Sequence, residues 1–168
     1  MSERDAEFTA YVVQRRPQLY RLAFLLCSDA HRAEDIVQVA LAKLYGAWDR
    51  ASRMDGIDAY TRRIVVNSHL DDTRRPWRRE RAREVDQLDG PAAVPLGIEE
   101  TDALWSALRG LPEGQRRVVV LRHYWGLSVE ETARDLGIST GTVKSQSSLA
   151  IHHLRRVLDP AASTGERR

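Results

Sequence analysis

The sequence of 168 residues contains one cysteine and no long apolar run. A single cysteine, Cys27, can form neither an internal disulfide nor a cysteine-based zinc site, which excludes a disulfide-stabilised fold. No stretch of eighteen apolar residues occurs, so we expect no membrane span. Because the first seven residues, MSERDAE, are polar and acidic, we expect no signal peptide and a cytoplasmic protein.

The sequence also lacks the short motifs that mark common enzyme sites. It has no glycine-rich phosphate loop, no H-E-x-x-H motif and no Ser/His/Asp pattern beyond chance. The five histidines are scattered, apart from the adjacent His152 and His153. Neighbouring residues on a helix point in different directions, so this pair cannot share a metal ion. We therefore expect no catalytic residue, no metal and no cofactor.

Charge is distributed unevenly, although the formal net charge is only +2. Residues 62–83 carry eight arginines against three acids, whereas residues 84–102 carry six acids and neither lysine nor arginine. This change of sign is typical of a surface that faces nucleic acid, followed by an acidic connector. The alternative is a solvated charged helix followed by a solvated loop.

Apolar residues recur every three or four positions, which predicts amphipathic helices rather than strands. In the first half of the chain we expect helices over residues 8–26, 30–48 and 57–75. Between the last two, residues 49–56 are expected to form a loop. Pro17 is expected to kink the first helix or to split it in two. Residues 84–98 contain two prolines and two glycines with little periodicity, which indicates a linker.

These patterns predict an all-α protein of two small helical domains joined by a flexible acidic linker. The first domain would span residues 1–83, and the linker would span residues 84–98. The second domain, over residues 99–158, would contain a helix-turn-helix. A polar tail over residues 159–168, rich in small side chains, is expected to be disordered.

The second domain carries the most specific local pattern in the sequence. Ser128 and Glu131 predict a capping box, in which each side chain bonds the backbone N–H of the other residue. Gly137 suits the left-handed position that ends a helix. Ser139 or Thr140 would then cap a second helix. Two short helices joined by a tight turn are therefore expected.

Ala133, Gly137 and Val143 have the separations of a helix-turn-helix, whose second helix enters the major groove of DNA. The alternative is an ordinary helical hairpin in a bundle. Periodicity places five residues on the inner face of the second helix: Val143, Ser147, Ala150, Leu154 and Val157. The residues near its start are expected to face bases and phosphates: Thr140, Gly141, Thr142, Lys144, Ser145 and Gln146.

The whole pattern resembles the extracytoplasmic-function (ECF) sigma factors of bacterial RNA polymerase, over residues 8–158. Residues 33–45 (AEDIVQVALAKLY) resemble the polymerase-binding helix of that family, and residues 60–75 (YTRRIVVNSHLDDTRR) resemble its minus-ten helix. Residues 111–133 (LPEGQRRVVVLRHYWGLSVEETA) resemble the start of its fourth conserved region. Residues 141–145 (GTVKS) match its recognition-helix motif. Trp-Arg-Arg after the third expected helix resembles an actinobacterial subgroup of the family.

The resemblance implies a protein that binds core RNA polymerase and directs it to promoter DNA. The polymerase clamp would be bound by the helix that contains Asp35, Gln38, Leu41 and Leu44. The minus-ten element would lie along Arg63, Asn67, Asp71, Arg74, Arg75 and Arg78. Residues 49–56 would take up a flipped, unpaired base. The second domain would read the minus-thirty-five duplex and touch the polymerase flap, and an anti-sigma factor is a further candidate partner.

Two positions depart from the family pattern. After Lys144 and Ser145 the family places several arginines, whereas this chain continues with QSSLAIHH. Fewer fixed positive charges predict weaker contact with phosphates and lower salt sensitivity. Leu149 lies within this stretch, and periodicity places it on the exposed side. In the polymerase-binding helix, Val39 stands where a polar residue is common.

A conventional repressor or activator is the alternative function. Such regulators combine a helix-turn-helix with a ligand-binding or dimerisation domain. Here the other domain is itself rich in arginine, which favours two DNA contacts on one chain. Co-purification with core polymerase separates the two functions, because a sigma factor binds the core enzyme and a repressor usually does not.

Overall fold

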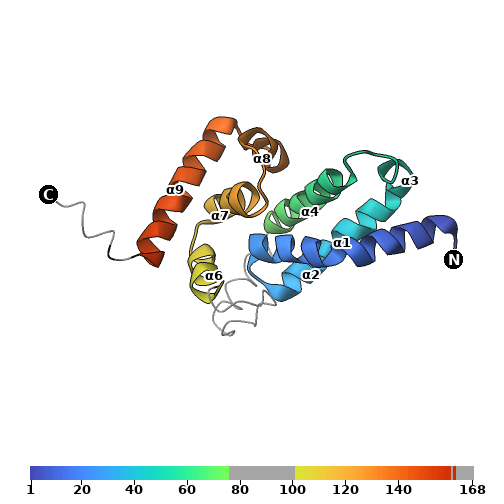
Figure 1. Ribbon diagram of the computed structural model, residues 1–168, viewed down its shortest axis with the longest axis horizontal. Helices are drawn as coiled ribbons and strands as arrows, with labels where there is room; N and C mark the ends of the chain where they lie inside the picture. Colours follow the sequence, from blue (N-terminus) through green and yellow to red (C-terminus); the bar gives the residue numbers. More distant parts are fainter. Residues whose placement is uncertain (76–100, 160, 162–168) are drawn as a thin grey trace. The chain divides into compact units, whose positions relative to one another are not determined.

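The computed structural model describes residues 1–75, 101–159 and 161, and all regular elements in these residues are helical (Figure 1). The chain divides into two compact units, residues 1–90 and residues 91–168. Buried apolar side chains form a core within each unit. The all-α fold class with two helical parts, expected from the sequence, is therefore confirmed.

Some of the predictions from sequence concern residues outside the described ranges. These are Arg78, the linker over residues 84–98, and most of the tail over residues 159–168. The domain boundaries at residues 83 and 98 fall there as well. The flexibility of the linker, the disorder of the tail and the two boundaries therefore stay predictions.

Three long helices form most of the first unit: α1 (Glu3–Cys27), α2 (Ala30–Gly46) and α4 (Ile57–Thr73). The short helix α3 (Trp48–Ala51) lies between α2 and α4. α1 packs against α2 and α4, and α2 packs against α4. Their apolar stripes meet in a core whose fully buried members include Leu22, Leu26, Val37, Val65 and Val66. Cys27 is buried as well.

α1 begins at Glu3, before the expected start at residue 8, because Ser2 caps it. The Asp5 N–H donates to Ser2 Oγ at 3.1 Å, and the Ser2 N–H donates to the Asp5 carboxylate at 3.4 Å. The helix continues through Pro17 as one element, so the proline does not split it. Pro17 has no N–H to donate to the carbonyl of Val13, four residues earlier. Both residues are exposed, so water can bind that carbonyl instead.

The connection between α2 and α4 differs from the loop expected over residues 49–56, because it begins with the helical turn α3. Trp48 is 4% exposed and shares a cluster with Leu44. The rings of Phe8 and Tyr11 pack against its indole, with centroids 5.2 and 5.4 Å away. Burial of this indole draws the segment onto the core and favours a compact helical turn.

The second unit contains α6 (Thr101–Arg109), α7 (Glu113–Val119), α8 (Val129–Leu136) and α9 (Thr140–Leu158). α7 continues into a π-helical turn, η1 (Val120–Tyr124). α9 packs against α6, α7 and α8, and Val118, Leu121 and Val143 are fully buried in this core. Pro112 occupies the N-cap of α7 rather than the first helical position that its sequence context predicts.

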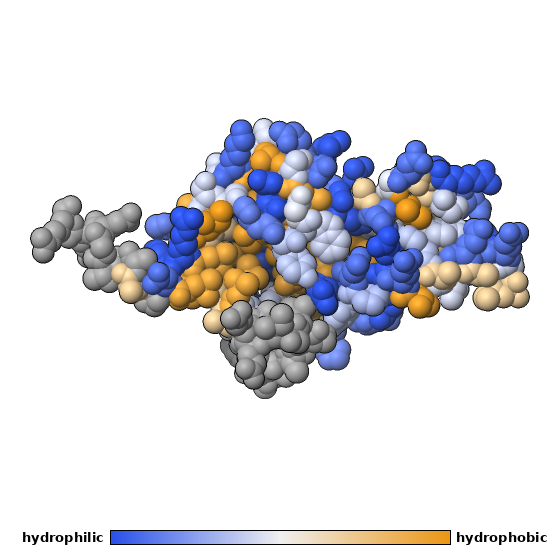
Figure 2. All heavy atoms as spheres, in the orientation of Figure 1, coloured by the Kyte–Doolittle hydropathy of each residue, from blue (hydrophilic) through white to orange (hydrophobic). Residues whose placement is uncertain are grey.

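Periodicity along α9 correctly places Val143 and Ala150 in the core and Leu149 on the surface, but it is wrong at the far end. Val157 was expected to face inward and is 61% exposed, and Leu158 is exposed too. No described helix covers the last turn of α9, so its apolar residues meet solvent. Figure 2 shows apolar atoms on the face in view over the lower part of α9 and α6.

Two further observations concern membranes and metals. Within the described ranges, every helix is either too short or too polar to cross a membrane. The same residues contain no group of three or more histidine, cysteine or acidic side chains arranged to hold a metal ion.

Candidate nucleic-acid interface

The start of α8, its end and the start of α9 have the hydrogen bonds and backbone geometry that the sequence predicts. The Glu131 N–H donates to Ser128 Oγ at 3.0 Å, and the Ser128 N–H donates to the Glu131 carboxylate at 3.1 Å. Gly137 ends α8 with a φ of 65°, where a larger side chain would be strained. The Thr142 N–H donates to Ser139 Oγ at 3.1 Å, so Ser139 is the residue that caps α9.

Two histidines help to fix α9 on the rest of its unit. His123 Nε2 of η1 lies 3.1 Å from Ser147 Oγ of α9. His153 Nδ1 of α9 lies 2.8 Å from Gln115 Oε1 of α7. The partners are far apart in sequence, and no local motif links them. Burial of Val143 and Ala150 already holds α9 against its unit, and the two histidine contacts further restrict its orientation.

The exposed face of α9 carries short hydroxyl side chains and no acid, since residues 140–158 contain neither Asp nor Glu. Four of the predicted DNA-facing side chains are exposed on it: Thr140, Thr142, Lys144 and Ser145. Gln146 is only half-exposed and lies beside Gly114 at the start of α7. The structure therefore brings most of the predicted contact residues together, with Gln146 at the edge of the surface.

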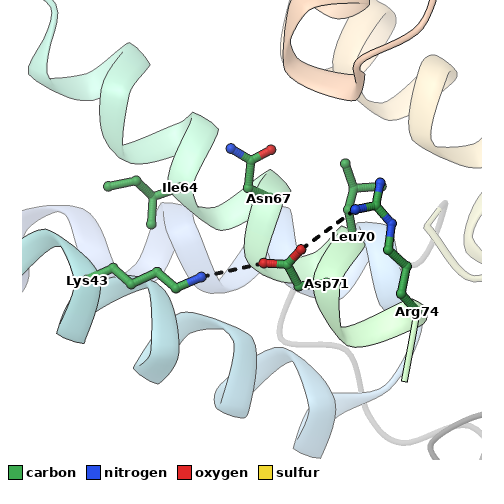
Figure 3. A pocket seen from close by; sticks show the side chains of 6 residues that line it. All are labelled: Lys43, Ile64, Asn67, Leu70, Asp71 and Arg74. Carbon is green, nitrogen blue, oxygen red and sulfur yellow. Dashed lines mark ion pairs between the residues drawn. The ribbon is translucent and has the colours of Figure 1, made fainter. Parts of the chain in front are cut away.

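A second polar surface runs along α4. Five predicted residues are exposed on this helix or just beyond its end: Arg63, Asn67, Asp71, Arg74 and Arg75. Lys43 of α2 reaches the same surface, with its Nζ 3.6 Å from Asp71 Oδ2. Arg74 Nη1 lies 3.9 Å from the other carboxylate oxygen of Asp71 (Figure 3). The carboxylate therefore lies between two cations and holds both near Asn67.

These residues border a hollow of about 370 Å³. Its lining consists of Lys43, Ile64, Asn67, Leu70, Asp71 and Arg74 (Figure 3). Apolar side chains beside an amide and charged groups can contact the face of a flat ring and hydrogen-bond its edge. Lys43 was not among the predicted site residues, because it belongs to α2 and no local pattern connects it with α4.

A partly buried ion pair fixes α4 on α2 next to this surface. Arg32 Nη2 and Nε lie 2.9 and 3.1 Å from Asp72 Oδ2. The two side chains are only 18% and 10% exposed. A charge-assisted contact with two N–H groups is strong and directional, so it supports the orientation of α4 in which Asp71 lies near Lys43.

The first turn of α4 is held from α1. The Tyr11 hydroxyl lies 3.0 Å from Asp58 Oδ1 and 2.9 Å from Thr61 Oγ1. Burial raises the pKa of Tyr11 to about 12, and the hydrogen bond to the Asp58 carboxylate acts in the same direction. Arg15 also pairs with Asp58 at 2.8 Å. The start of α4 is thus tied to α1 by a neutral phenol and an ion pair.

The start of α1 fastens α3 in a similar way. Arg4 Nε lies 2.8 Å from Asp49 Oδ1, and its guanidinium lies 4.2 Å from the centroid of the Tyr45 ring. The Tyr45 hydroxyl donates to Asp5 Oδ1 at 2.7 Å. This bond raises the pKa of Tyr45 and lowers that of Asp5. These contacts position the beginning of the segment 49–56.

The four residues expected to bind polymerase do not share one environment. Asp35 and Gln38 are exposed on α2, and Leu41 is half-buried. Leu44 is fully buried in the core, so we assign it to packing inside the unit rather than to the surface. Val39, which departs from the family pattern, is 48% exposed on the same side of the helix as Asp35.

Comparisons with known proteins identify both units. Residues 7–79 match the family model described as Sigma-70 region 2, and residues 101–154 match Sigma-70, region 4. The chain is 39% identical to the RNA polymerase sigma-E factor of Streptomyces avermitilis, over 91% of this chain and 86% of that protein. It is 33% identical to the ECF RNA polymerase sigma factor SigM of Mycobacterium tuberculosis, over 84% and 71%. The chain belongs to the ECF sigma factors.

Solved structures agree with this assignment. The sigma factor RpoE of Bartonella quintana, in complex with the anti-sigma factor NepR, matches this sigma factor with a TM-score of 0.68 at 27% identity. That match covers 96% of this chain and 99% of RpoE. CnrH, in complex with the cytosolic domain of CnrY, matches with a TM-score of 0.60 at 25% identity, over 94% and 90% of the two chains.

Proposed function

We propose that this ECF sigma factor binds core RNA polymerase and directs it to promoters through two DNA contacts. α9 would bind the minus-thirty-five duplex, and α4 would bind the melted minus-ten element. One observation carries the proposal: each unit presents a helix surface that suits DNA, and the surfaces of α4 and α9 differ in kind. A recognition helix whose charged residues are all basic suits a duplex groove, whereas a hollow beside Asn67 suits an unpaired base.

At the minus-thirty-five duplex, Lys144 would contact phosphate, while Thr142 and Ser145 would hydrogen-bond base edges or phosphates. Thr140 would lie at the entry of the helix into the groove. Gln146 has less exposed surface than the others, so we give it a contact at the edge of the groove. The Ser139 cap binds the Thr142 N–H and so orders the backbone of the first turn of α9.

At the minus-ten element, Asn67 would read an exposed base edge, because its amide has both donors and an acceptor. The arginines along the strand would hold phosphates: Arg63, Arg74, Arg75 and, outside the described residues, Arg78. We add Lys43 to this set, since it lines the same hollow. Asp71 would orient Lys43 and Arg74 through its two ion pairs. The segment 49–56 would take up a flipped base.

Core polymerase would be bound by both units. The exposed side of α2, with Asp35, Gln38 and Leu41, would meet the clamp. The apolar end of α9, with Val157 and Leu158, would meet the flap. We infer that this sigma factor has no catalytic site, since the polymerase performs the chemistry, and that it works in the cytoplasm, where the polymerase is.

An anti-sigma factor is a second proposed partner. The two solved relatives described above were determined in complexes, RpoE with the anti-sigma factor NepR and CnrH with the cytosolic domain of CnrY. We propose that a protein of this kind also binds this chain and competes with core polymerase. Capture from source cells with the full chain, followed by addition of core polymerase, should release the bound protein. Capture that core polymerase does not displace would contradict the competition.

Reconstitution with core polymerase tests the main proposal. The full chain should co-purify with the core enzyme and support run-off transcription from a subset of genomic fragments. The double variant Asp35→Ala/Gln38→Ala should lose co-purification, whereas Gln14→Ala/Gln18→Ala, two exposed changes on α1, should not. Promoter binding without any association with core polymerase would instead support the repressor alternative.

A further inference from the structure

The middle of α9 presents an apolar side chain on an otherwise polar surface. Leu149 is 48% exposed, although Ala150 next to it is fully buried. Residues 142, 145, 149 and 152 are spaced by three, four and three, so they share one face of the helix. Thr142, Ser145 and His152 are all exposed on that face. Leu149 is therefore aligned with the residues proposed to read the minus-thirty-five duplex.

No positive charge lies in the middle of this face: Arg156 continues it at its far end, whereas Lys144 and Arg155 lie on a neighbouring side of the helix. Lys144 is exposed near the start, and Arg155 and Arg156 are exposed near the end. Between Lys144 and Arg155 the chain contains no lysine, arginine or acid. At a rise of 1.5 Å per residue these cations are separated by roughly 16 Å, which exceeds the major-groove width of about 12 Å. These charges can therefore reach phosphates beside the groove, while the face with Leu149 is turned towards the bases.

The major groove offers one apolar group to such a side chain, the 5-methyl of thymine. A leucine placed against guanine or cytosine would desolvate hydrogen-bonding atoms without replacing their bonds. We propose that Leu149 is a specificity-determining residue that selects thymine at one position of the minus-thirty-five element. The proposal rests on the duplex-binding role of α9 and adds a base preference to it.

The surroundings of Leu149 favour DNA over a protein as its occupant. Its exposed neighbours are Ser145, Ser148 and His152, and the only charged residues of α9 are basic. A protein-binding patch would join several apolar side chains, as Val157 and Leu158 do at the end of the helix. Those two residues follow Leu149 by about two turns, so they do not extend its surface.

Selection from a DNA library tests the proposal with the full chain assembled on core polymerase. Duplexes with a randomised minus-thirty-five element are selected by wild type, Leu149→Ala and Leu149→Arg. Wild type should enrich thymine at one position, and Leu149→Ala should lose that preference. Leu149→Arg should switch it to guanine, because arginine bonds guanine O6 and N7. Leu104→Ala, a change to an exposed leucine of α6, should keep the wild-type base preference.

Removal of the thymine methyl group then isolates the contact. The selected duplex is made with deoxyuridine in place of that thymine and compared by competition binding. Wild type should bind it about fourfold more weakly, the effect of one buried methyl, whereas Leu149→Ala should bind both duplexes equally.

Three results would overturn the proposal. One is the same enriched sequence for wild type and both Leu149 variants, and another is wild-type binding insensitive to deoxyuridine. The third is a Leu149→Arg protein that no longer assembles with core polymerase, which would assign Leu149 to a protein contact. If wild type on core polymerase enriches no sequence and supports no transcription, the proposed function itself fails.

Discussion

The surfaces of α4 and α9 both carry positive charge, but they are organised differently. On α4, the Asp71 carboxylate lies between Lys43 and Arg74, and a hollow opens beside them. α9 has no acid along its whole length. A carboxylate between cations attracts both of them to the same place, whereas a surface of one sign attracts phosphates from a distance. The difference suits α4 to one unpaired base and α9 to a regular duplex.

The two helices are also held in different ways. α4 buries Val65 and Val66 in the core and is also tied to its neighbours by polar contacts, the Arg32–Asp72 ion pair on one side and the Tyr11 hydroxyl on another. α9 is held mainly by fully buried apolar groups such as Val143 and Ala150. Loss of one partner of a buried polar contact leaves the other unsatisfied, so the α4 unit should be the more sensitive to single polar substitutions.

Among the substitutions that test this difference, Asp72→Ala should have the largest effect on stability. Removal of one partner of a buried ion pair costs about 3–5 kcal/mol; because this pair is only partly buried, we expect the lower end, about 3 kcal/mol. The free energy of unfolding of the first unit should fall by that amount, measured by amide hydrogen exchange in α2 and α4. Asp71→Ala is the matched control: its ion pairs are exposed and should contribute less than about 1 kcal/mol. Equal losses for the two variants would contradict the role given to the buried pair.

The next largest effect concerns the α4 surface itself. Asn67→Ala with Arg74→Ala removes an amide and a guanidinium from the hollow. Hydrogen bonds to charged groups contribute about 1.5–3 kcal/mol each, so open-complex formation should fall by at least roughly tenfold. Permanganate reactivity of unpaired thymines measures it, and Gln18→Ala on α1 is the exposed control.

In the same double variant, binding to core polymerase and to the minus-thirty-five duplex should persist, since neither needs the hollow. A normal open complex would falsify the role of the α4 surface. It would also remove the difference between the two helices, because α9 alone would then account for DNA recognition, as in a repressor.

The features that the sequence predicted correctly are local ones. The Ser128–Glu131 capping box, the left-handed Gly137 and the Ser139 cap depend on residues within four positions of each other. Local hydrogen bonds of this kind are set by residue type and spacing, so a sequence contains all the information needed to predict them. The exposed position of Leu149 was also predicted, because Ala150 and Val143 fix which face of α9 is buried.

The features that sequence analysis missed depend on helix packing. Lys43 enters the minus-ten surface and Arg32 pairs with Asp72 only because α2 lies against α4. Periodicity along one helix does not reveal the register between two. The exposure of Val157 has the same cause, since the pattern shows an apolar stripe but not where the covering helices end.

Alkaline pH should weaken the first unit through Tyr11. Its pKa is raised to about 12 in the folded protein, against about 10 in an unfolded chain, so folding favours the protonated phenol. Stability is therefore fully retained below pH 10 and falls as the pH rises towards 12. Because the side chain is only half-buried, we expect a loss of about 1 kcal/mol. Tyr11→Phe should not show this loss of unfolding free energy when urea unfolding is measured between pH 9 and 12. Identical pH profiles for wild type and Tyr11→Phe would contradict the role given to Tyr11.

The smallest effects should separate phosphate contact from base contact on α9. Lys144→Ala removes a point charge that carries no base information, so duplex affinity should fall a few-fold on cognate and scrambled DNA alike, and the slope of log affinity against log salt should drop by about 1. Thr142→Ala removes a hydroxyl and no charge, so the salt slope should stay unchanged while preference among related sequences shifts. Because α9 has few cations, the loss of one should remove a large share of the salt dependence of its DNA binding. If both variants change the slope equally, the hydroxyl face contributes no base recognition, and the contrast between α4 and α9 would rest on charge alone.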